Sequence, residues 1–304
     1  MTCKSSFKSG SEGHDLRVRD TRVFSLIRQI EEDDLPQVVT FLNEIFPERS
    51  RAYWEKGLGK IGALPSLPGR PRYGYVLDDN GIRGVVLAIS SRHGDESDEM
   101  IITNLGSWCV APSHRGRAAW KLCLHSTSED SVTHTSLSSL PHVFSMIRRV
   151  GFKDWTAGQI AGIGRCTAPD FSGIISVEDA SLEEISPREL AVLRDHQEFG
   201  CIAFCVRIKD RLAPMIFLPR KVKRIIPCAQ LIYCKHLPDF LANSRAINLH
   251  LARRGYPLMI FDANGPAKEV LGQYYPGKAP KFFKGAKPRC DVDHTYSELV
   301  YLRV

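Results

Sequence analysis

The sequence predicts an α/β protein of two units with a similar order of elements, in which helices flank β-sheets. Residues 79–81 (Asp-Asn-Gly) lie between two apolar runs, which is typical of a β-hairpin. The apolar, β-branched run 100–110 is followed by a short break and a run of helix formers, so a strand leads into a helix. After residue 172 an order of strands, long helix and strand begins again. These observations favour two related α/β units.

Length and composition bound the class of protein. The chain has 304 residues, 43% hydrophobic and 25% charged, which suits a globular protein of two domains. Residues 1–20 are polar and charged without an apolar segment, so we expect a disordered tail and no signal peptide. No apolar run reaches the roughly 18 residues of a membrane span, so no membrane partner is expected. The nine cysteines form no CxxC pair, which favours reduced core thiols and a cytoplasmic location.

The first unit is expected to cover residues 21–170. Its periodicity and breaks predict elements at the following positions: strands at 23–30, 73–77, 84–89, 100–110 and 132–139, helices at 35–45, 51–58, 118–125 and 141–150, and a last strand with a linker at 157–172.

The second unit is expected to cover residues 171–304. The same reasoning predicts helices at 182–195 and 237–254, and strands at 201–208, 214–218, 225–233 and 258–262, with residues 297–302 closing the chain.

A basic turn, VAPSHRGRAAW (residues 110–120), joins the strand at 100–110 to the next helix. The start of a helix has unpaired N–H groups and a partial positive charge, which suit a phosphate. Arg115 and Arg117 add cationic charge, and Gly116 allows the backbone to approach a ligand closely. The turn is therefore a candidate phosphate site, and a ligand-free basic turn is the alternative.

This turn resembles motif A of the GNAT (GCN5-related N-acetyltransferase) superfamily, a strand-to-helix loop that binds the pyrophosphate of coenzyme A. Aligned on Arg115 and Gly116, the chain has Ala118 and Trp120 where the family usually has glycines. A frame shifted by two residues puts Gly116 and Ala118 on the glycine positions, with Ser113 in place of the basic residue.

A second resemblance lies about 35 residues downstream, where VGFKDW (150–155) is similar to the end of motif B. Gly151 and Phe152 match, and Arg149 stands for the basic residue. Ile147 occupies the position of a tyrosine that often serves as general acid, so that role does not transfer. The resemblance implies two GNAT-like units with mixed, mostly antiparallel sheets. The coenzyme loop would lie in residues 21–170, because its counterpart at 233–243 has no glycine.

The resemblance implies an acyltransferase that moves an acyl group from acetyl-CoA or another acyl-CoA to an amine, or a hydroxyl, of a small acceptor. Backbone on the strand before motif A would polarise the thioester carbonyl, and Ser107 and Cys109 are further polar candidates for catalysis. The residues expected to bind the coenzyme are Trp108, Cys109, Val110, His114, Arg115, Gly116, Arg117 and Ala118.

Acylation of an amine also needs a proton acceptor. The cluster CDVDH combines a histidine with two carboxylates, so His294 is the candidate base, oriented and made more basic by Asp291 or Asp293. A solvated loop is the alternative. Three ligands within four residues make an awkward metal cage, so no metal is expected. The preceding segment 274–289 interleaves aromatic and basic residues and predicts either core or a cleft wall.

The net charge of +7 is accounted for by an anionic coenzyme, so nucleic acid is not an expected partner. Two other functions stay open. The run RKVKR (220–224) would suit an aminoacyl-tRNA-dependent transferase of Fem type. The missing tyrosine and Trp120 would suit a non-catalytic acyl-CoA-binding protein that keeps the fold.

Overall fold

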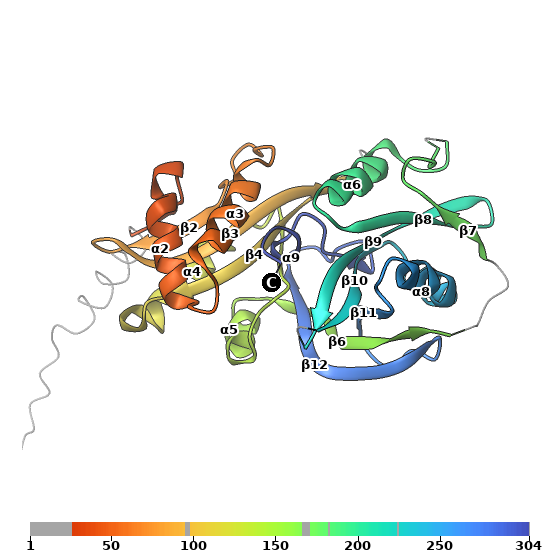
Figure 1. Cartoon of the computed structure of the whole chain (residues 1–304). Helices are drawn as coiled ribbons and strands as arrows, with labels where there is room; N and C mark the ends of the chain where they lie inside the picture. The colour runs from red at the N-terminus through yellow and green to blue at the C-terminus, as the bar shows by residue number, and fades with distance from the viewer. Residues whose placement is uncertain (1–25, 95–97, 166–170, 182, 224, 304) are drawn as a thin grey trace, which may run out of the picture.

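The computed structural model describes residues 26–94, 98–165, 171–181, 183–223 and 225–303. The expected tail at 1–20 lies outside this part of the chain. In the described residues the strands form one continuous mixed sheet, with helices on both faces (Figure 1). Its strands follow one another in the order β1, β2, β3, β4, β5, β12, β6, β11, β10, β9, β8 and β7, with β13 beside β10.

The bounds of the strands are as follows: β1 (Ile27–Gln29), β2 (Gly74–Asp78), β3 (Ile82–His93), β4 (Met100–Val110), β5 (Thr133–Ser136), β6 (Lys153–Gly164), β7 (Phe171–Ile175), β8 (Ile202–Ile208), β9 (Arg211–Val222), β10 (Ile226–Cys234), β11 (Leu258–Ala263), β12 (Val270–Lys284) and β13 (Val292–Asp293).

The bounds of the helices are as follows: α2 (Leu35–Ile45), α3 (Arg51–Gly62), α4 (Arg117–Ser126), α5 (Phe144–Arg149), α6 (Pro187–Glu198), α7 (Leu237–Ala242), α8 (Ser244–Arg253) and α9 (Glu298–Tyr301). Short 3-10 turns precede α2, α4 and α5 at Glu32–Asp34, Pro112–His114 and Pro141–Val143. None of the described helices has the length and apolar character needed to cross a membrane.

In the N-terminal part, the antiparallel meander β1–β4 carries α2 and α3 on one face and α4 and α5 on the other (Figure 1). Alternation along β3 explains this, because Val85 and Leu87 pack toward α2 and α3 whereas Val86 packs toward α4. The predicted hairpin turn is confirmed, with Asn80 and Gly81 both at positive φ. β4 then pairs with β5 in parallel.

In the C-terminal part, α7 and α8 cover one face of the sheet and α6 covers the other. The long helix predicted at 237–254 is wrong in one respect, because it breaks into α7 and α8 at Asn243. The Asn243 side chain donates to the Asp239 carbonyl, which also accepts from the Asn243 backbone N–H. α6 begins at Pro187 rather than at residue 182, because Ser186 caps it through a capping box with Glu189.

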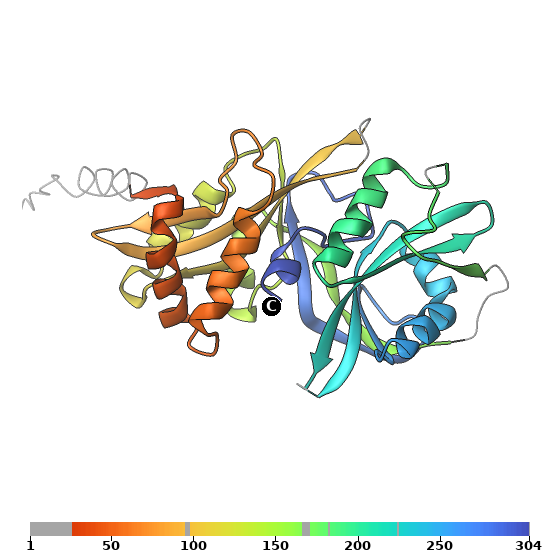
Figure 2. The ribbon, with the colours of Figure 1, turned by 45° about the horizontal axis from the view of Figure 1, so that its top comes forward.

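The two long strands β6 and β12 lie side by side in the middle of the sheet. β12 pairs with β5 on its other side, and β6 pairs with β11. The segment after β12 pairs with β10 as β13 and ends in α9. In Figure 2, α9 (dark blue) lies between the orange helices and the green α6. The aromatic residues Phe282 and Phe283 of β12 are buried, so that part of segment 274–289 is core.

Candidate active site

The basic turn forms the start of α4, as predicted. Gly116 caps the helix with φ 87° and ψ −113°, a conformation that a residue with a Cβ rarely adopts. No side chain caps this helix in the described residues, so its first-turn N–H groups are available to a ligand. Arg115 and Arg117 are exposed beside them. His114 fixes the turn through a 3.2 Å contact of its Nε2 with Oδ2 of Asp79.

The strand before the turn contains a β-bulge. Cys109 pairs with Val85 and Gly106 with Leu87, so two residues of β4, Ser107 and Trp108, oppose one residue of β3. Ser107 has φ 48°, which marks the bulge. The parallel pairing of β4 with β5 ends at Leu105. Residues 106–110 therefore have no strand neighbour on the β5 side within the described sheet, and this opening of the β4–β5 ladder is called the gap. The backbone groups of these residues that do not pair with β3 face it.

On the α4 face of the sheet, a small pocket lies beside this gap. The indole Nε1–H of Trp108 is buried there and has no hydrogen-bond partner among the described residues. Ile147, at the position of the tyrosine of motif B, also lines the pocket. The pocket is apolar apart from one hydroxyl and one indole N–H, and its lining consists of Val86, Leu105, Trp108, Cys123, Ser136, Ile147 and Phe152.

On the opposite face of the gap lies the carboxylate of Glu298, the first residue of α9. It is 1% exposed, and α9 packs in the core formed with α2 and α3. Oγ of Ser138 donates to Oε1 of Glu298 at 2.7 Å. The Glu298 backbone N–H donates to Oδ1 of Asn104 on β4 at 2.8 Å. These bonds hold the carboxylate against the bulge.

The second carboxylate oxygen of Glu298 is buried against β4. The Ser107 backbone lies close enough to influence the carboxylate, but among the described residues no group donates a hydrogen bond of ordinary geometry to this oxygen. A Cβ on Gly106 would lie 2.2 Å from this Oε2, so only glycine leaves room for it. Burial raises the pKa of Glu298 to about 7, although Ser138, Lys281 and the Ser107 backbone act to lower it. A carboxylate with a pKa near neutrality can accept and release a proton at physiological pH.

The predicted cluster CDVDH does not act as one unit in the structure. Oδ2 of Asp291 accepts from the backbone N–H of Leu237 at 2.7 Å, which caps α7. Asp293 is buried and contacts Nδ1 of His93 at 2.7 Å. Neither carboxylate orients His294, so that part of the expectation is wrong.

His294 is 1% exposed, and its Nε2 lies 3.4 Å from Oδ2 of Asp262 on β11. Its ring meets Trp155 edge to face at 5.3 Å between centroids. The expected rise of the His294 pKa is also wrong, since burial lowers it to about 4 and the attraction of Asp262 does not compensate. Among the described residues, no three His, Cys, Asp or Glu side chains are placed to hold a metal.

Burial raises the pKa of Cys109 to about 12, so its thiol is neutral at physiological pH and a poor nucleophile. It packs beside the core of α2 and α3.

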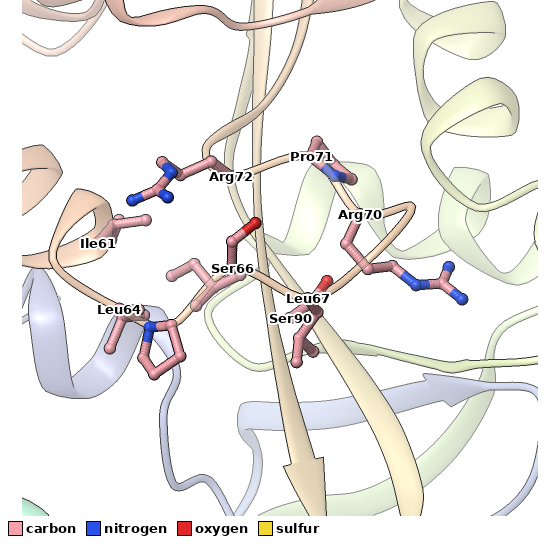
Figure 3. A pocket seen from close by; sticks show the side chains of 10 residues that line it. Ile61, Leu64, Ser66, Leu67, Arg70, Pro71, Arg72 and Ser90 are labelled. Atoms are coloured by element: carbon pink, nitrogen blue, oxygen red, sulfur yellow. The ribbon is translucent and has the colours of Figure 1, made fainter.

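A second pocket lies under the loop between α3 and β2, against Ile89 and Ser90 of β3 (Figure 3). The guanidinium groups of its two arginines point away from each other. Arg70 pairs with Glu129, and Arg72 donates to the carbonyl of Gly62. Because both cations are engaged, this pocket presents no free charge for a ligand.

Comparisons of the sequence with family models and with curated proteins find no match. The structure is similar to a GCN5-related N-acetyltransferase from Anabaena variabilis, with 12% identity, a TM-score of 0.53, and 84% of this chain and 71% of that one covered. It is also similar to a putative acetyltransferase from Pyrococcus horikoshii, with 13% identity, a TM-score of 0.50, and 89% and 92% covered. The fold is that of the GCN5-related N-acetyltransferases. The fold that the motif resemblance implies is therefore confirmed.

Within this GNAT fold, the structure explains how one departure from motif A is accommodated. Trp120 stands at a glycine position of motif A, but its side chain packs against the core beneath α4.

Glu298 was missed by sequence reasoning because SELV (297–300) carries no motif and lies far from β4 in the chain. The one feature of the sequence that marks Glu298 is that it is an acidic residue inside an otherwise apolar C-terminal run.

Proposed function

We propose that this protein is an acyltransferase that transfers an acyl group from acyl-CoA to an amine, with Glu298 as the proton acceptor. The proposal depends on two features, the apolar pocket and the Glu298 carboxylate, which lie on opposite faces of the gap between β4 and β5. The apolar pocket opens on the α4 face, and the buried carboxylate lies on the other face, against the bulge of β4.

The coenzyme phosphates would lie at the start of α4, near Arg115, Gly116 and the following N–H groups. Its pantetheine amides would pair with the free edge of residues 106–110, as an added strand pairs with a sheet edge. The reacting thioester would then lie at the bulge. His114, Arg117 and Ala118 belong to the same loop and helix start and would line the phosphate site.

In the reaction, the amine nitrogen attacks the thioester carbon and the carbonyl oxygen takes the negative charge. Trp108, Cys109 and Val110 are the candidate backbone donors, and those whose N–H does not pair with β3 would stabilise that oxygen. Glu298 accepts the proton that the nitrogen loses. The C–S bond then breaks, and the thiolate leaves as coenzyme A, which is protonated by water because Ile147 has no proton to give. Amide and free coenzyme A are the products.

His294 is the alternative proton acceptor that the sequence predicts, and Ser107 contributes its backbone to the Glu298 site. The structure favours Glu298, because a buried histidine with a pKa of about 4 is a weak base at neutral pH.

The chain order supports two GNAT-like halves in which only the first binds coenzyme. β10 and β11 are parallel like β4 and β5, and β10 also has a bulge, between Leu231 and Tyr233. In this second half the gap is filled by the chain itself, since β13 pairs with β10 and His294 N–H donates to the Ile232 carbonyl. β6 and β12 would be exchanged between the halves, because each pairs with strands of the other.

Isothermal titration calorimetry with a panel of acyl-CoAs tests this proposal. The titration should show one acyl-CoA bound per chain. In a parallel unfolding experiment, acyl-CoA at 100 times its Kd should raise the free energy of unfolding by about 2.7 kcal/mol. Binding of two per chain would contradict the role given to β13. No response to any acyl-CoA at millimolar concentration would remove the proposal. A response to aminoacyl-tRNA instead would favour the Fem-type transferase, and binding without turnover would favour a non-catalytic protein.

A further inference from the structure

One face of the sheet carries a row of polar side chains across four neighbouring strands, β9, β10, β11 and β6. Nη1 of Arg220 donates to Oε1 of Gln230 at 2.7 Å, and Nε2 of Gln159 donates to Oδ1 of Asp262 at 2.9 Å. This is the face that packs toward α9, because Leu218, two residues before Arg220 on the same strand, belongs to the core that contains α9.

The Asp262 end of the row leads to the proposed catalytic carboxylate. Oδ2 of Asp262 lies 3.4 Å from His294, four residues before Glu298. The buried Nζ of Lys281 donates to the Leu137 carbonyl at 2.7 Å, and the next residue, Ser138, binds Glu298. The row therefore runs from Arg220 toward Glu298 along one side of the sheet.

Arg220 stands at the other end of the row and forms no direct ion pair within the described part of the chain, although the charge of Asp262 acts on it from within the row. Its side chain is half-buried, and the partner recorded for it is the neutral amide of Gln230. Within the described part of the chain, no carboxylate oxygen lies within 4.0 Å of its guanidinium. Burial lowers the pKa of Arg220 and the positive charge of nearby Arg49 lowers it further, whereas the negative charge of Asp262 acts to raise it. Holding a half-buried guanidinium there without an anion in direct contact is costly.

Arg49 comes from the loop between α2 and α3, in the other half of the molecule. Its guanidinium lies over the ring of Tyr53, 4.8 Å from the centroid. The hydroxyl of Tyr53 is buried without a hydrogen-bond partner among the described residues, and the charges of both Arg49 and Glu298 act on it. Cationic and donor groups from both halves thus lie on the Glu298 side of the sheet.

We propose that Arg220, supported by Arg49, binds a carboxylate of the acceptor, so that the acceptor is a small amino acid rather than a simple amine. This inference rests on the proposed function. One guanidinium edge of Arg220 is taken by Gln230, and the remaining edge matches the two oxygens of a carboxylate.

Matched acid and amide acceptors test the proposal in an assay of thiol release from acyl-CoA. A panel of free amino acids is compared with the corresponding amino-acid amides. For the best acceptor, kcat/KM for the acid should exceed that for the amide by about 10- to 100-fold. Arg220→Gln should remove this preference by raising KM for the acid. Arg211→Gln, on the same strand but paired with Asp239, should keep it. Equal use of acid and amide, or a preference for phosphoethanolamine, would overturn the proposal.

A second measurement separates this inference from the proposed function. The same amino acids and amides, without coenzyme, are tested for thermal stabilisation of the parent protein and of Arg220→Gln. The acid should raise the melting temperature of the parent only. If acyl-CoA fails to bind while the acid still stabilises the parent, the proposed reaction fails and the carboxylate site stands. If no acid stabilises the parent more than its amide, the carboxylate site is overturned.

Discussion

Ser138 and Glu298 are joined by a hydrogen bond of 2.7 Å although 160 positions separate them in the sequence. The bond links the end of β5 to the start of α9 and holds a carboxylate at the bulge of β4. The predictions below follow from this contact and from the helix start at Gly116.

Replacing Glu298 with glutamine should lower kcat by about 100-fold or more and leave acyl-CoA affinity unchanged, since the amide cannot accept the proton. In the parent enzyme, kcat should rise as the pH passes through about 7, because the carboxylate must be ionised. Steady-state kinetics from pH 5.5 to 9 measure both effects. His294→Ala is the comparison. If it alone lost turnover while Glu298→Gln kept the parental rate, the histidine would be the base.

The buried carboxyl should also make stability depend on pH. Its pKa is raised from 4.5 to about 7 in the folded state, so the folded protein binds the proton more tightly than the unfolded chain. The favourable contribution is present below about pH 4.5 and is lost as the pH rises toward 7, about 3 kcal/mol in all. Relative to the parent, Glu298→Gln should therefore be more stable at pH 8 than at pH 5. Denaturant unfolding at the two pH values measures this, and a pH-independent difference would contradict it.

Replacing Gly106 with alanine should displace the Glu298 carboxylate, since the new Cβ would lie 2.2 Å from Oε2. We expect kcat to fall at least about 10-fold, because the carboxylate is displaced while the basic turn at Gly116 is untouched. Gly59→Ala is the control, since a Cβ there meets nothing within 4 Å. Unchanged turnover in Gly106→Ala would mean that the position of Glu298 does not matter for the reaction.

Replacing Arg115 and Arg117 with alanine should weaken coenzyme binding by about 1.5–3 kcal/mol for each charge-assisted bond lost. Both side chains are exposed, so the fold should persist, as circular dichroism would show. Arg211→Ala, far from the loop in sequence, is the control in calorimetry. Affinity equal to that of the parent in the double variant would place the phosphates elsewhere.

The sequence alone determined the elements that depend on neighbouring residues. The turn at Asn80 and Gly81 and the strand-to-helix transition at Gly116 are set by backbone preferences within a few positions. The resemblance to the GNAT superfamily rested on such local features, and the fold that it implies is the fold observed. The position of the basic helix start, which is the proposed phosphate site, could therefore be predicted from about ten residues.

Only the tertiary structure decided which distant groups meet. The pairing of β6 with β12 and the contact of Asp293 with His93 join segments far apart in the chain, which no local periodicity encodes. The tertiary structure also decided which side chain can act as a base. His294 was expected to gain basicity from its neighbours in sequence, but burial makes it a weak base, whereas burial raises the pKa of Glu298. Desolvation depends on what surrounds a group in three dimensions, and that is set by packing between the two halves of the chain.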